Sequence, residues 1–328
     1  MKNKTKAIIL LSILCPLSIW GCLSAAALFY TDAYELRRSK ESSCMLESIE
    51  TIRINPSLTR YKFLSKRESS GVAIIVHGLN VRPLKMFEIV HELTKMDIEV
   101  FSLSLKGHGT NYSKSADMQD VDARMNSFKS VSYNIWHEEL ASAYEVANLQ
   151  SSEKNVPIYF VGYSIGGLLG VDLLASNSQI HFDKLVLFAP ALTVKSYCFQ
   201  LQILSYFSDF VIPSVSPRNY RANDGTPIAA YNVLFDTISR LNQSNISRTN
   251  VPILVFIDKK DEFVSAEALE KFVRKHKLNQ WKICYIENQR NSNRVYHHLI
   301  IDSQSVGQKT WNSMVSQLKQ HINSSLIL

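Results

Sequence analysis

The sequence is poor in cysteine and has no arrangement of residues that is typical of a structural metal site. Five of its 328 residues are cysteines: Cys15, Cys22, Cys44, Cys198 and Cys284. The first two lie in an uncharged apolar segment and the other three are far apart, so at most one disulfide could form among those three. No spacing of cysteine and histidine fits a metal site. We therefore expect no disulfide framework, no bound metal and no other cofactor.

Basic runs interleaved with aromatic residues are also missing, although the formal net charge is +7. A surface that binds nucleic acid needs such runs, so we expect no nucleic-acid partner. The basic stretch KFVRKHK at residues 271–277 is typical of a solvated helix face instead. Internal repeats and low-complexity tracts are absent too. With 46% hydrophobic and 20% charged residues, the composition is that of a globular protein with one large domain.

Charge is absent from residues 7–30, a stretch long enough to span a bilayer and preceded by three lysines. Three interpretations stay open. The segment is an uncleaved anchor with the lysines in the cytoplasm, a signal peptide cleaved after the small residues 25–27, or a lipoprotein signal processed at Cys22. Each predicts that the rest of the chain is membrane-anchored or exported and lies on the extracytoplasmic, or periplasmic, side.

The remaining sequence alternates between short apolar runs and helical patterns. After the N-terminal segment at 1–30 we expect a polar tether at 31–45 and one domain at 46–328. Two β-like runs lie near 48–54 and 60–65. Six further apolar runs, rich in valine, isoleucine and aromatic residues, cover 71–78, 98–105, 156–162, 184–190, 251–258 and 281–287. Helical patterns cover 84–96, 132–150, 165–176 and 266–277. This alternation predicts an α/β fold with a mostly parallel sheet and helices on both faces.

Residues 191–250 interrupt the alternation. They contain no convincing parallel strand, and they are too long for an ordinary loop. We interpret them as a helical cap inserted after the strand at 184–190. Its first part is rich in aromatic residues, which either form the core of the cap or line a site for an acyl chain, since ligand pockets are mostly apolar. These residues are Phe199, Tyr206, Phe207 and Phe210.

The stretch PIYFVGYSIGG at 157–167 runs from an apolar strand directly into a helical pattern. Ser164 lies at the junction, where a sharp turn needs small neighbours, and Gly162 and Gly166 supply them. Gly-x-Ser-x-Gly at such a junction is the nucleophile elbow, which exposes a serine hydroxyl above a sheet. The pattern alone also fits an ordinary serine N-cap. The rest of the chain must therefore supply a base, an orienting acid and an oxyanion hole.

Candidates for the base and the acid follow Ser164 in the order that accompanies a nucleophile elbow, with the acid before the histidine. Asp258 and Asp261 come at the end of the strand at 251–258, and His297 and His298 come after the last strand. The two histidines point to different sides of any regular backbone. Only one of them can therefore face the serine.

An oxyanion hole needs two preorganised backbone N–H donors. Ile165, directly after the serine and at the start of a helix, is the first candidate. The second is Leu79 in HGLN, where the preceding glycine lets the backbone approach a ligand. We expect His77 and His108 to fix their loops by hydrogen bonds.

Together these motifs resemble the α/β-hydrolases, and within them the bacterial carboxylesterase and monoacylglycerol lipase (lysophospholipase-like) group. The resemblance runs from about residue 70 to the C-terminus. The motifs that carry it are HGLN (77–80), LKGHGT (105–110), Trp136, GYSIGG (162–167), DEFVS (261–265) and YHHLIID (296–302). It implies an α/β-hydrolase fold with an inserted cap. The group usually has a leucine or histidine where this chain has Tyr163.

The resemblance also implies roles for the candidate residues. In that group the acid begins a D-x-x-V stretch, which selects Asp261, and the histidine stands five residues before an aspartate, which selects His297 with Asp302. Asp258 and His298 are the alternates; the group has a small apolar residue at the position of His298. Ser164 would be the nucleophile, and the backbone N–H groups of Leu79 and Ile165 would form the oxyanion hole.

The expected function is therefore that of a serine hydrolase that cleaves carboxylic esters through an acyl-enzyme. Monoacyl lipid esters, of the monoacylglycerol or lysophospholipid type, are the favoured substrates, because both the apolar cap and the N-terminal segment suggest substrates that partition into a membrane. The membrane itself would be a partner through that segment. A peptidase or thioesterase on the same fold is an alternative, and a catalytically inactive, membrane-tethered binding module is the rival from another class.

Overall fold

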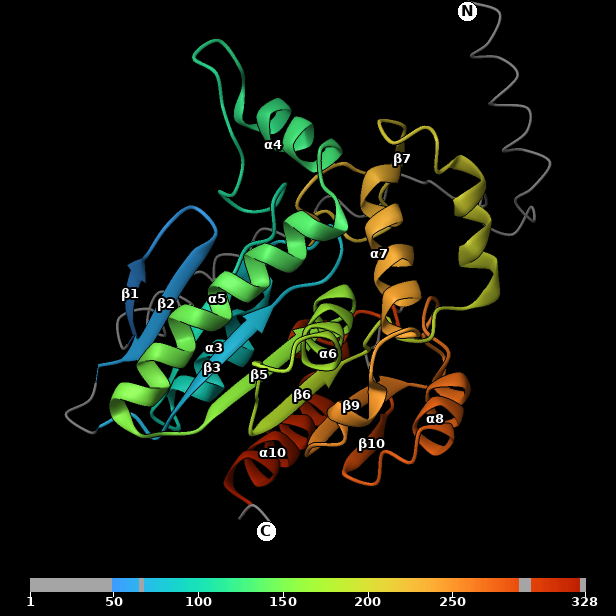
Figure 1. The fold of residues 1–328 in the computed structure, drawn as a ribbon. Helices are drawn as coiled ribbons and strands as arrows, with labels where there is room; N and C mark the ends of the chain where they lie inside the picture. The colour runs from blue at the N-terminus through green and yellow to red at the C-terminus, as the bar shows by residue number, and fades with distance from the viewer. Residues whose placement is uncertain (1–48, 65–67, 289–295, 325–328) are drawn as a thin grey trace, which may run out of the picture. The chain divides into compact units, whose positions relative to one another are not determined.

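Eight strands form the central sheet of the computed structural model, which describes residues 49–64, 68–288 and 296–324. Their order across the sheet is β1-β2-β4-β3-β5-β6-β9-β10. Figure 1 labels all of these strands except β4. The strands are β1 (Ile49–Arg53), β2 (Leu58–Phe63), β3 (Gly71–Val76), β4 (Ile98–Leu103), β5 (Ile158–Tyr163), β6 (Lys184–Phe188), β9 (Ile253–Asp258) and β10 (Trp281–Ile286). The predicted N-terminal segment and tether lie outside the described residues.

The sheet is parallel except at one edge. β1 pairs antiparallel with β2, and β2 antiparallel with β4, whereas β4, β3, β5, β6, β9 and β10 are mutually parallel. Every residue of β3, β4, β5, β6 and β9 is buried. Strands that are covered on both faces need side chains suited to burial on both sides, which explains the continuous apolar runs of the sequence. The predicted mostly parallel sheet is confirmed.

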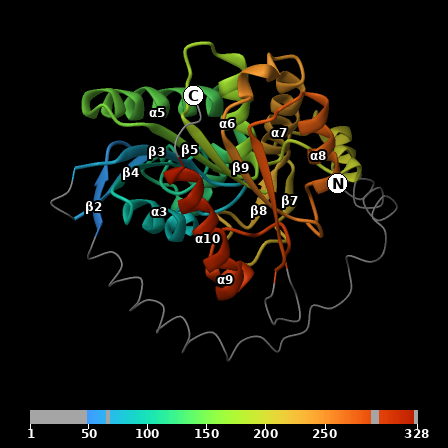
Figure 2. The same ribbon diagram turned by 90° about the horizontal axis from the view of Figure 1, so that it is seen from below.

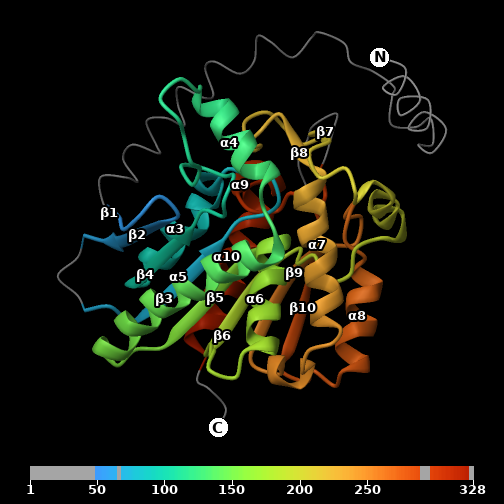
Figure 3. The same ribbon diagram turned by 45° about the horizontal axis from the view of Figure 1, so that its top comes forward.

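Helices cover both faces of the sheet (Figures 2 and 3). One face carries α5 (Tyr133–Lys154), α6 (Ile165–Ser176), α7 (Ile228–Leu241) and α8 (Ala266–Lys275), and the other carries α3 (Phe87–Thr94) and α10 (Gln308–Asn323). Strand β3 shows how the two cores are filled, because successive side chains point to opposite faces. Val72, Ile74 and Val76 join the core under α5 and α6, while Ala73 and Ile75 join the core under α3 and α10.

The insertion after β6 is more varied than the predicted helical cap. Besides the long helix α7 it contains a 3-10 helix η2 (Ser196–Leu204), a small antiparallel sheet of β7 (Val211–Pro213) and β8 (Gly225–Pro227), and a 3-10 turn η3 (Ile246–Thr249). Helix α7 packs against α6 and contributes to the core on that face. The predicted sheet with helices on both faces and an inserted cap is thus present, and α7 supplies the helical part of the cap.

The predicted elements agree with the structure apart from short differences at their ends. The helix predicted over 84–96 begins as a 3-10 turn, η1 (Pro83–Met86), before α3. The sequence pattern does not predict α4 (Asp120–Lys129), because only Ala123, Ser127 and Phe128 of this helix are buried. It therefore lacks the wide apolar stripe that reveals a surface helix. The last helices are the short α9 (Ser303–Val306) and α10.

None of the helices in the described ranges combines the length and the apolar character needed to cross a membrane. The uncharged stretch at 7–30, on which the membrane prediction rests, lies outside those ranges. Cys198 and Cys284 are both free thiols. The other three cysteines fall outside the described residues.

A buried carboxyl group lies where α5, α6 and α7 meet. Tyr133 donates a hydrogen bond of 2.8 Å to one oxygen of Asp172, and the other oxygen has no partner within the described structure. The guanidinium of Arg240 lies 4.2 Å from the centre of the Tyr133 ring, and the ring of His137 stacks on the Tyr133 ring with 5.1 Å between the ring centres. Burial raises the pKa of Asp172 from 3.8 to about 6, although Tyr133 and Arg240 act in the opposite direction.

We expect Asp172→Asn to flatten the pH dependence of stability. The folded state holds the Asp172 proton more tightly than the unfolded chain, so this group favours folding below pH 3.8 and loses that contribution as the pH rises to about 6. The difference corresponds to about 3 kcal/mol. Urea unfolding between pH 4 and 8 should show that the variant loses this slope and gains stability at pH 7. Asp236→Asn, an exposed change on α7, is the control; equal slopes for all three proteins would contradict the assignment.

Candidate active site

Ser164 lies between the end of β5 and the first residue of α6, at the carboxyl edge of the parallel strands. Its φ is 52° and its ψ is −116°, a backbone conformation that a residue with a side chain rarely adopts. The surrounding structure holds it there: its N–H donates to the carbonyl of Phe188, and its carbonyl accepts from Leu168 and Ala191. Strained residues of this kind persist only where neighbouring contacts determine them, and they concentrate at functional sites.

The two glycines that flank this turn are required by close backbone contacts. A Cβ atom on Gly166 would lie 2.4 Å from the carbonyl oxygen of Val76, and one on Gly162 would lie 2.6 Å from the backbone of Gly167. Only glycine allows the helix to start so close to β3 and β5. The predicted nucleophile elbow is therefore present in the backbone geometry as well as in the sequence motif.

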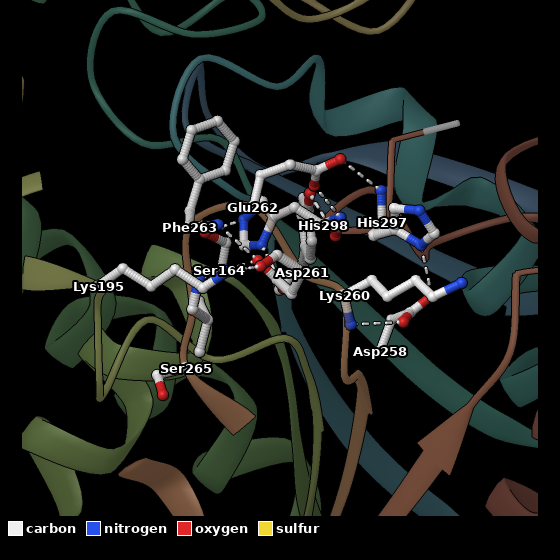
Figure 4. A network of polar contacts seen from close by, with 12 residues as sticks. Ser164, Lys195, Asp258, Lys260, Asp261, Glu262, Phe263, Ser265, His297 and His298 are labelled. Atoms are coloured by element: carbon white, nitrogen blue, oxygen red, sulfur yellow. Dashed lines mark hydrogen bonds and ion pairs between the residues drawn. The ribbon is translucent and has the colours of Figure 1, made fainter. Parts of the chain in front are cut away.

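A relay of two hydrogen bonds leads from the serine to an acid (Figure 4). The Nε2 atom of His298 lies 2.9 Å from the Oγ of Ser164, and the Nδ1 atom of His298 lies 2.8 Å from Oδ2 of Asp261. Asp261 is fully buried and the serine nearly so. The three side chains come from the loops that follow β5, β9 and β10, which all end at the same edge of the sheet.

The prediction that His297 faces the serine is wrong. The ring of His297 points to Asp258 instead, with 2.8 Å between Nδ1 and Oδ2 (Figure 4). The two histidines are neighbours in a segment without regular structure, and their rings lie on opposite sides of it, so a shift of one residue exchanges them. The spacing rule carried over from the family, with the histidine five residues before Asp302, selects the wrong member of the pair.

The acid selected from the D-x-x-V stretch, Asp261, is the one that contacts the ring of His298. Its other oxygen, Oδ1, accepts the backbone N–H groups of Phe263 and Val264, each at 2.8 Å. Burial by itself would raise the pKa of Asp261, but His298 and these two N–H groups outweigh it and keep the pKa below its usual value. The carboxyl group is thus ionised at neutral pH and can orient the imidazole.

Two backbone N–H groups near Ser164 are available for an anionic oxygen. Neither the N–H of Leu79 nor that of Ile165 donates to any acceptor in the part of the chain that the structure describes. The loop that carries Leu79 lies against the serine, since a Cβ atom on Gly78 would be 3.3 Å from the Cβ of Ser164. Both predicted oxyanion donors therefore lack an acceptor among the described residues, and the segments that carry them lie next to Ser164.

His77 and His108 hold the loop of Leu79 in place. The Nε2 of His77 accepts from the N–H of Leu105 at 3.1 Å, and the Nε2 of His108 accepts from the N–H of Asn80 at 3.0 Å. Burial lowers the pKa of His77 to about 4, so it is neutral and can accept this bond. The expectation that both histidines fix their loops is confirmed.

Two polar residues at this edge are missing from the candidates named from the sequence. Glu262 accepts the backbone N–H groups of both His297 and His298. Asn80 bonds through its side chain to the backbone of Asn223 and Gly225 in the cap. Glu262 directly follows the acid in DEFVS, and Asn80 ends HGLN, but nothing in the local pattern marks the distant partners.

The aromatic residues predicted for the cap do not form a cap core. Phe199 lies on η2, and Tyr206, Phe207 and Phe210 lie just after it; all four side chains are exposed, and Tyr206 is 96% exposed. Phe199 also contacts the ring of Phe235 on α7, with the ring centres 5.3 Å apart. Of the two interpretations left open by the sequence, the first is excluded. The second, a site for an acyl chain, stays a prediction.

Within the described ranges, no group of three or more histidine, cysteine, aspartate or glutamate side chains is arranged to hold a metal ion. The chemistry that the site can perform is that of a serine hydroxyl beside a carboxylate-oriented imidazole.

Comparisons with known proteins show what this chain is similar to. Residues 67–226 match the family model described as serine aminopeptidase, S33. No curated protein matches the sequence. Among solved structures, the chain is similar to a soluble variant of monoglyceride lipase from Saccharomyces cerevisiae in complex with a substrate analogue, with a TM-score of 0.64 and 13% identity over 83% of this chain and 94% of that one.

Two further solved structures show the same likeness. The monoacylglycerol lipase of Paleococcus ferrophilus has a TM-score of 0.56 and 16% identity, over 83% of this chain and 99% of that one. A structure from the work on LipS and LipT, two metagenome-derived lipolytic enzymes, has a TM-score of 0.61 and 16% identity, over 83% of this chain and all of that one. At such identities the likeness shows the fold. The resemblance seen in the sequence is thereby confirmed: this chain has the α/β-hydrolase fold and is similar to lipases and esterases of that superfamily.

Proposed function

We propose that this protein is a serine hydrolase that cleaves carboxylic esters. The observation that carries the proposal is the relay of hydrogen bonds from Ser164 through His298 to Asp261, at 2.9 and 2.8 Å. A serine hydroxyl is a weak nucleophile until an oriented base takes its proton, and these contacts are the ones that such activation needs. The unused N–H groups of Leu79 and Ile165 complete the set.

In the proposed reaction the Oγ of Ser164 attacks the ester carbonyl carbon while His298 Nε2 takes the hydroxyl proton. The negative charge that develops on the carbonyl oxygen is stabilised by the N–H groups of Leu79 and Ile165. His298 then gives the proton to the leaving alcohol as the ester C–O bond breaks, which leaves an acyl-enzyme. Water, deprotonated by His298, attacks the acyl carbon. The bond from this carbon to Oγ of Ser164 then breaks, His298 returns the proton to Oγ, and the acid leaves. Asp261 stabilises the imidazolium in both halves of the reaction.

Monoacyl lipid esters, of the monoacylglycerol or lysophospholipid type, are the substrates we propose. Exposed apolar side chains on the insertion, among them Phe199 and Phe207, could contact an acyl chain. The likeness in fold to the two monoacylglycerol lipases agrees with this. We further propose that residues 1–30 anchor or export the protein, so that it meets such lipids at a membrane.

The test of this proposal is a series of p-nitrophenyl esters from acetate to palmitate, together with labelling by a fluorophosphonate probe. Each buried CH₂ contributes about 0.8 kcal/mol, or roughly a fourfold change in affinity. We expect kcat/KM to rise at about that rate over several methylenes and then level off when the acyl site is full. A steep preference for acetate would limit the protein to small esters.

The name of the matching family model supports one second candidate, peptide hydrolysis. Aminoacyl p-nitroanilides, assayed beside the esters, separate the two activities. Turnover of anilides that exceeds ester turnover would replace the esterase proposal. A protein that neither turns over an ester or anilide nor reacts with the probe would instead be a binding module.

A further inference from the structure

The histidine of the relay comes from a segment without helix or strand. His298 lies between β10 and α9, in a stretch of bends that follows residues outside the described ranges. A histidine ring in such a segment is placed only as well as its backbone is placed. The backbone N–H groups of the segment therefore need defined acceptors, because buried N–H groups without partners are costly.

One carboxylate supplies both acceptors. Oε1 of Glu262 accepts the N–H of His297 at 2.9 Å, and Oε2 accepts the N–H of His298 at 2.7 Å (Figure 4). Hydrogen bonds to an ionised acceptor are shorter and stronger than those between neutral groups. Two bonds from one rigid carboxylate to two successive N–H groups fix both the position and the direction of this part of the backbone.

The direction of the backbone decides which histidine reaches the serine. With the two N–H groups bound to Glu262, the ring of His298 lies against Asp261 and Ser164 and the ring of His297 lies against Asp258. The hydroxyl of Tyr163 adds a bond of 3.1 Å to the carbonyl of His298.

The backbone around Glu262 is itself fixed by contacts with the first residues of the cap insertion. Val264, two residues further on, forms a β-bridge with Val194 at the start of the insertion, and the hydroxyl of Tyr197 donates to the carbonyl of Glu262. The ammonium group of Lys195 donates to the carbonyl of Asp261. The acid and the residue that binds the histidine segment are thus fixed as one unit.

We propose that Glu262 is the positioning residue that sets the register of the histidine segment and presents His298, in place of His297, to Ser164. The proposal rests on the proposed hydrolase function for its kinetic test. It assigns no chemistry to Glu262, whose carboxylate contacts backbone N–H groups and not the reacting atoms.

The test compares Glu262→Ala, Glu262→Gln and Glu262→Asp with the full wild-type chain. A misplacement of about 1 Å costs roughly 100-fold in rate. We expect Glu262→Ala to lower kcat per fluorophosphonate-titrated site about 10- to 100-fold, with KM within about twofold of the wild type. Glu262→Gln keeps one acceptor and should recover part of the loss, whereas the shorter side chain of Glu262→Asp should recover less. Glu267→Ala, an exposed change on the neighbouring helix α8, is the matched control and should leave kcat unchanged.

Two readouts separate positioning from a role in stability alone. A structural role would lower the melting temperature and the fraction of titratable sites, with kcat per titrated site within about twofold of the wild type; that result would overturn the proposal. The second readout is the NMR resonance of the His298 imidazole N–H bound to Asp261, in histidine labelled with ¹⁵N. It should broaden or shift in Glu262→Ala. An unchanged resonance overturns the proposed role of Glu262, whether or not the wild type hydrolyses esters. Absence of ester hydrolysis by the wild type would remove the proposed hydrolase function, and the NMR readout would still test the role of Glu262.

Discussion

Ser164→Ala should abolish ester hydrolysis and fluorophosphonate labelling, with kcat lower by about 10⁶-fold. The change removes the one oxygen that can attack the carbonyl carbon, and the oxyanion donors alone provide only a small residual rate. The fold should survive, because the serine hydroxyl contacts only His298 among its described partners. Kinetics on several p-nitrophenyl esters, with probe labelling and circular dichroism, check this result.

Ser176→Ala is the matched control for this variant. Ser176 lies at the exposed end of the same helix, α6, and its hydroxyl bonds only to carbonyls of that helix. It should keep full activity. Ser164→Gly adds a second check, since glycine relieves the unfavourable φ of 52° and should raise the melting temperature while activity stays absent. Substantial ester turnover by Ser164→Ala would show that another group is the nucleophile.

His298→Ala should be almost as damaging as the loss of the serine, whereas His297→Ala should cost about tenfold or less. Residues of a triad act as a unit, so that removal of the base alone approaches removal of the nucleophile. The prediction follows from the contact between His298 and Ser164, and it reverses the ranking that the sequence spacing implied. The measurement is kcat for both variants on the same ester, per titrated site.

The acids provide an independent check on the choice of histidine. Asp261→Asn should lower kcat by about 10⁴-fold, because the amide favours the wrong tautomer of the imidazole. Asp258→Asn should have a mild effect, since Asp258 contacts His297 and the N–H of Lys260 and not the relay. If Asp258→Asn and His297→Ala are instead the inactive variants, then His297 and Asp258, and not His298 and Asp261, activate Ser164.

Much of the candidate active site could be predicted from the sequence, because the motifs that mark it consist of residues close together in the chain. The strand, the turn and the helix around Ser164 are consecutive in sequence, and glycines are needed wherever the backbone is as close as at Gly162 and Gly166. The continuous apolar runs also fixed the layer architecture, because strands covered on both faces cannot alternate. The short stretch DEFVS identified Asp261 by the same kind of local pattern.

The choice between the two histidines could not be made in this way. His297 and His298 are chemically identical neighbours, and the groups that separate them, Glu262 and the two aspartates, lie about 35 to 40 residues away in the sequence. The same holds for Asn80 and its partners in the cap, which are more than 140 residues away.

The sequence by itself determined the α/β class, the order of the predicted elements, the nucleophile elbow and the serine, aspartate and histidine candidates from which the hydrogen-bond relay is built. These depend on hydrophobic periodicity, on glycine at tight turns and on short motifs, each of which involves residues close together in the sequence. The tertiary structure alone decided which histidine faces Ser164, and that the cap aromatics are exposed and not its core. Both depend on contacts between distant segments, because a side chain of given chemistry can lie on either side of its backbone until packing and long-range hydrogen bonds select one.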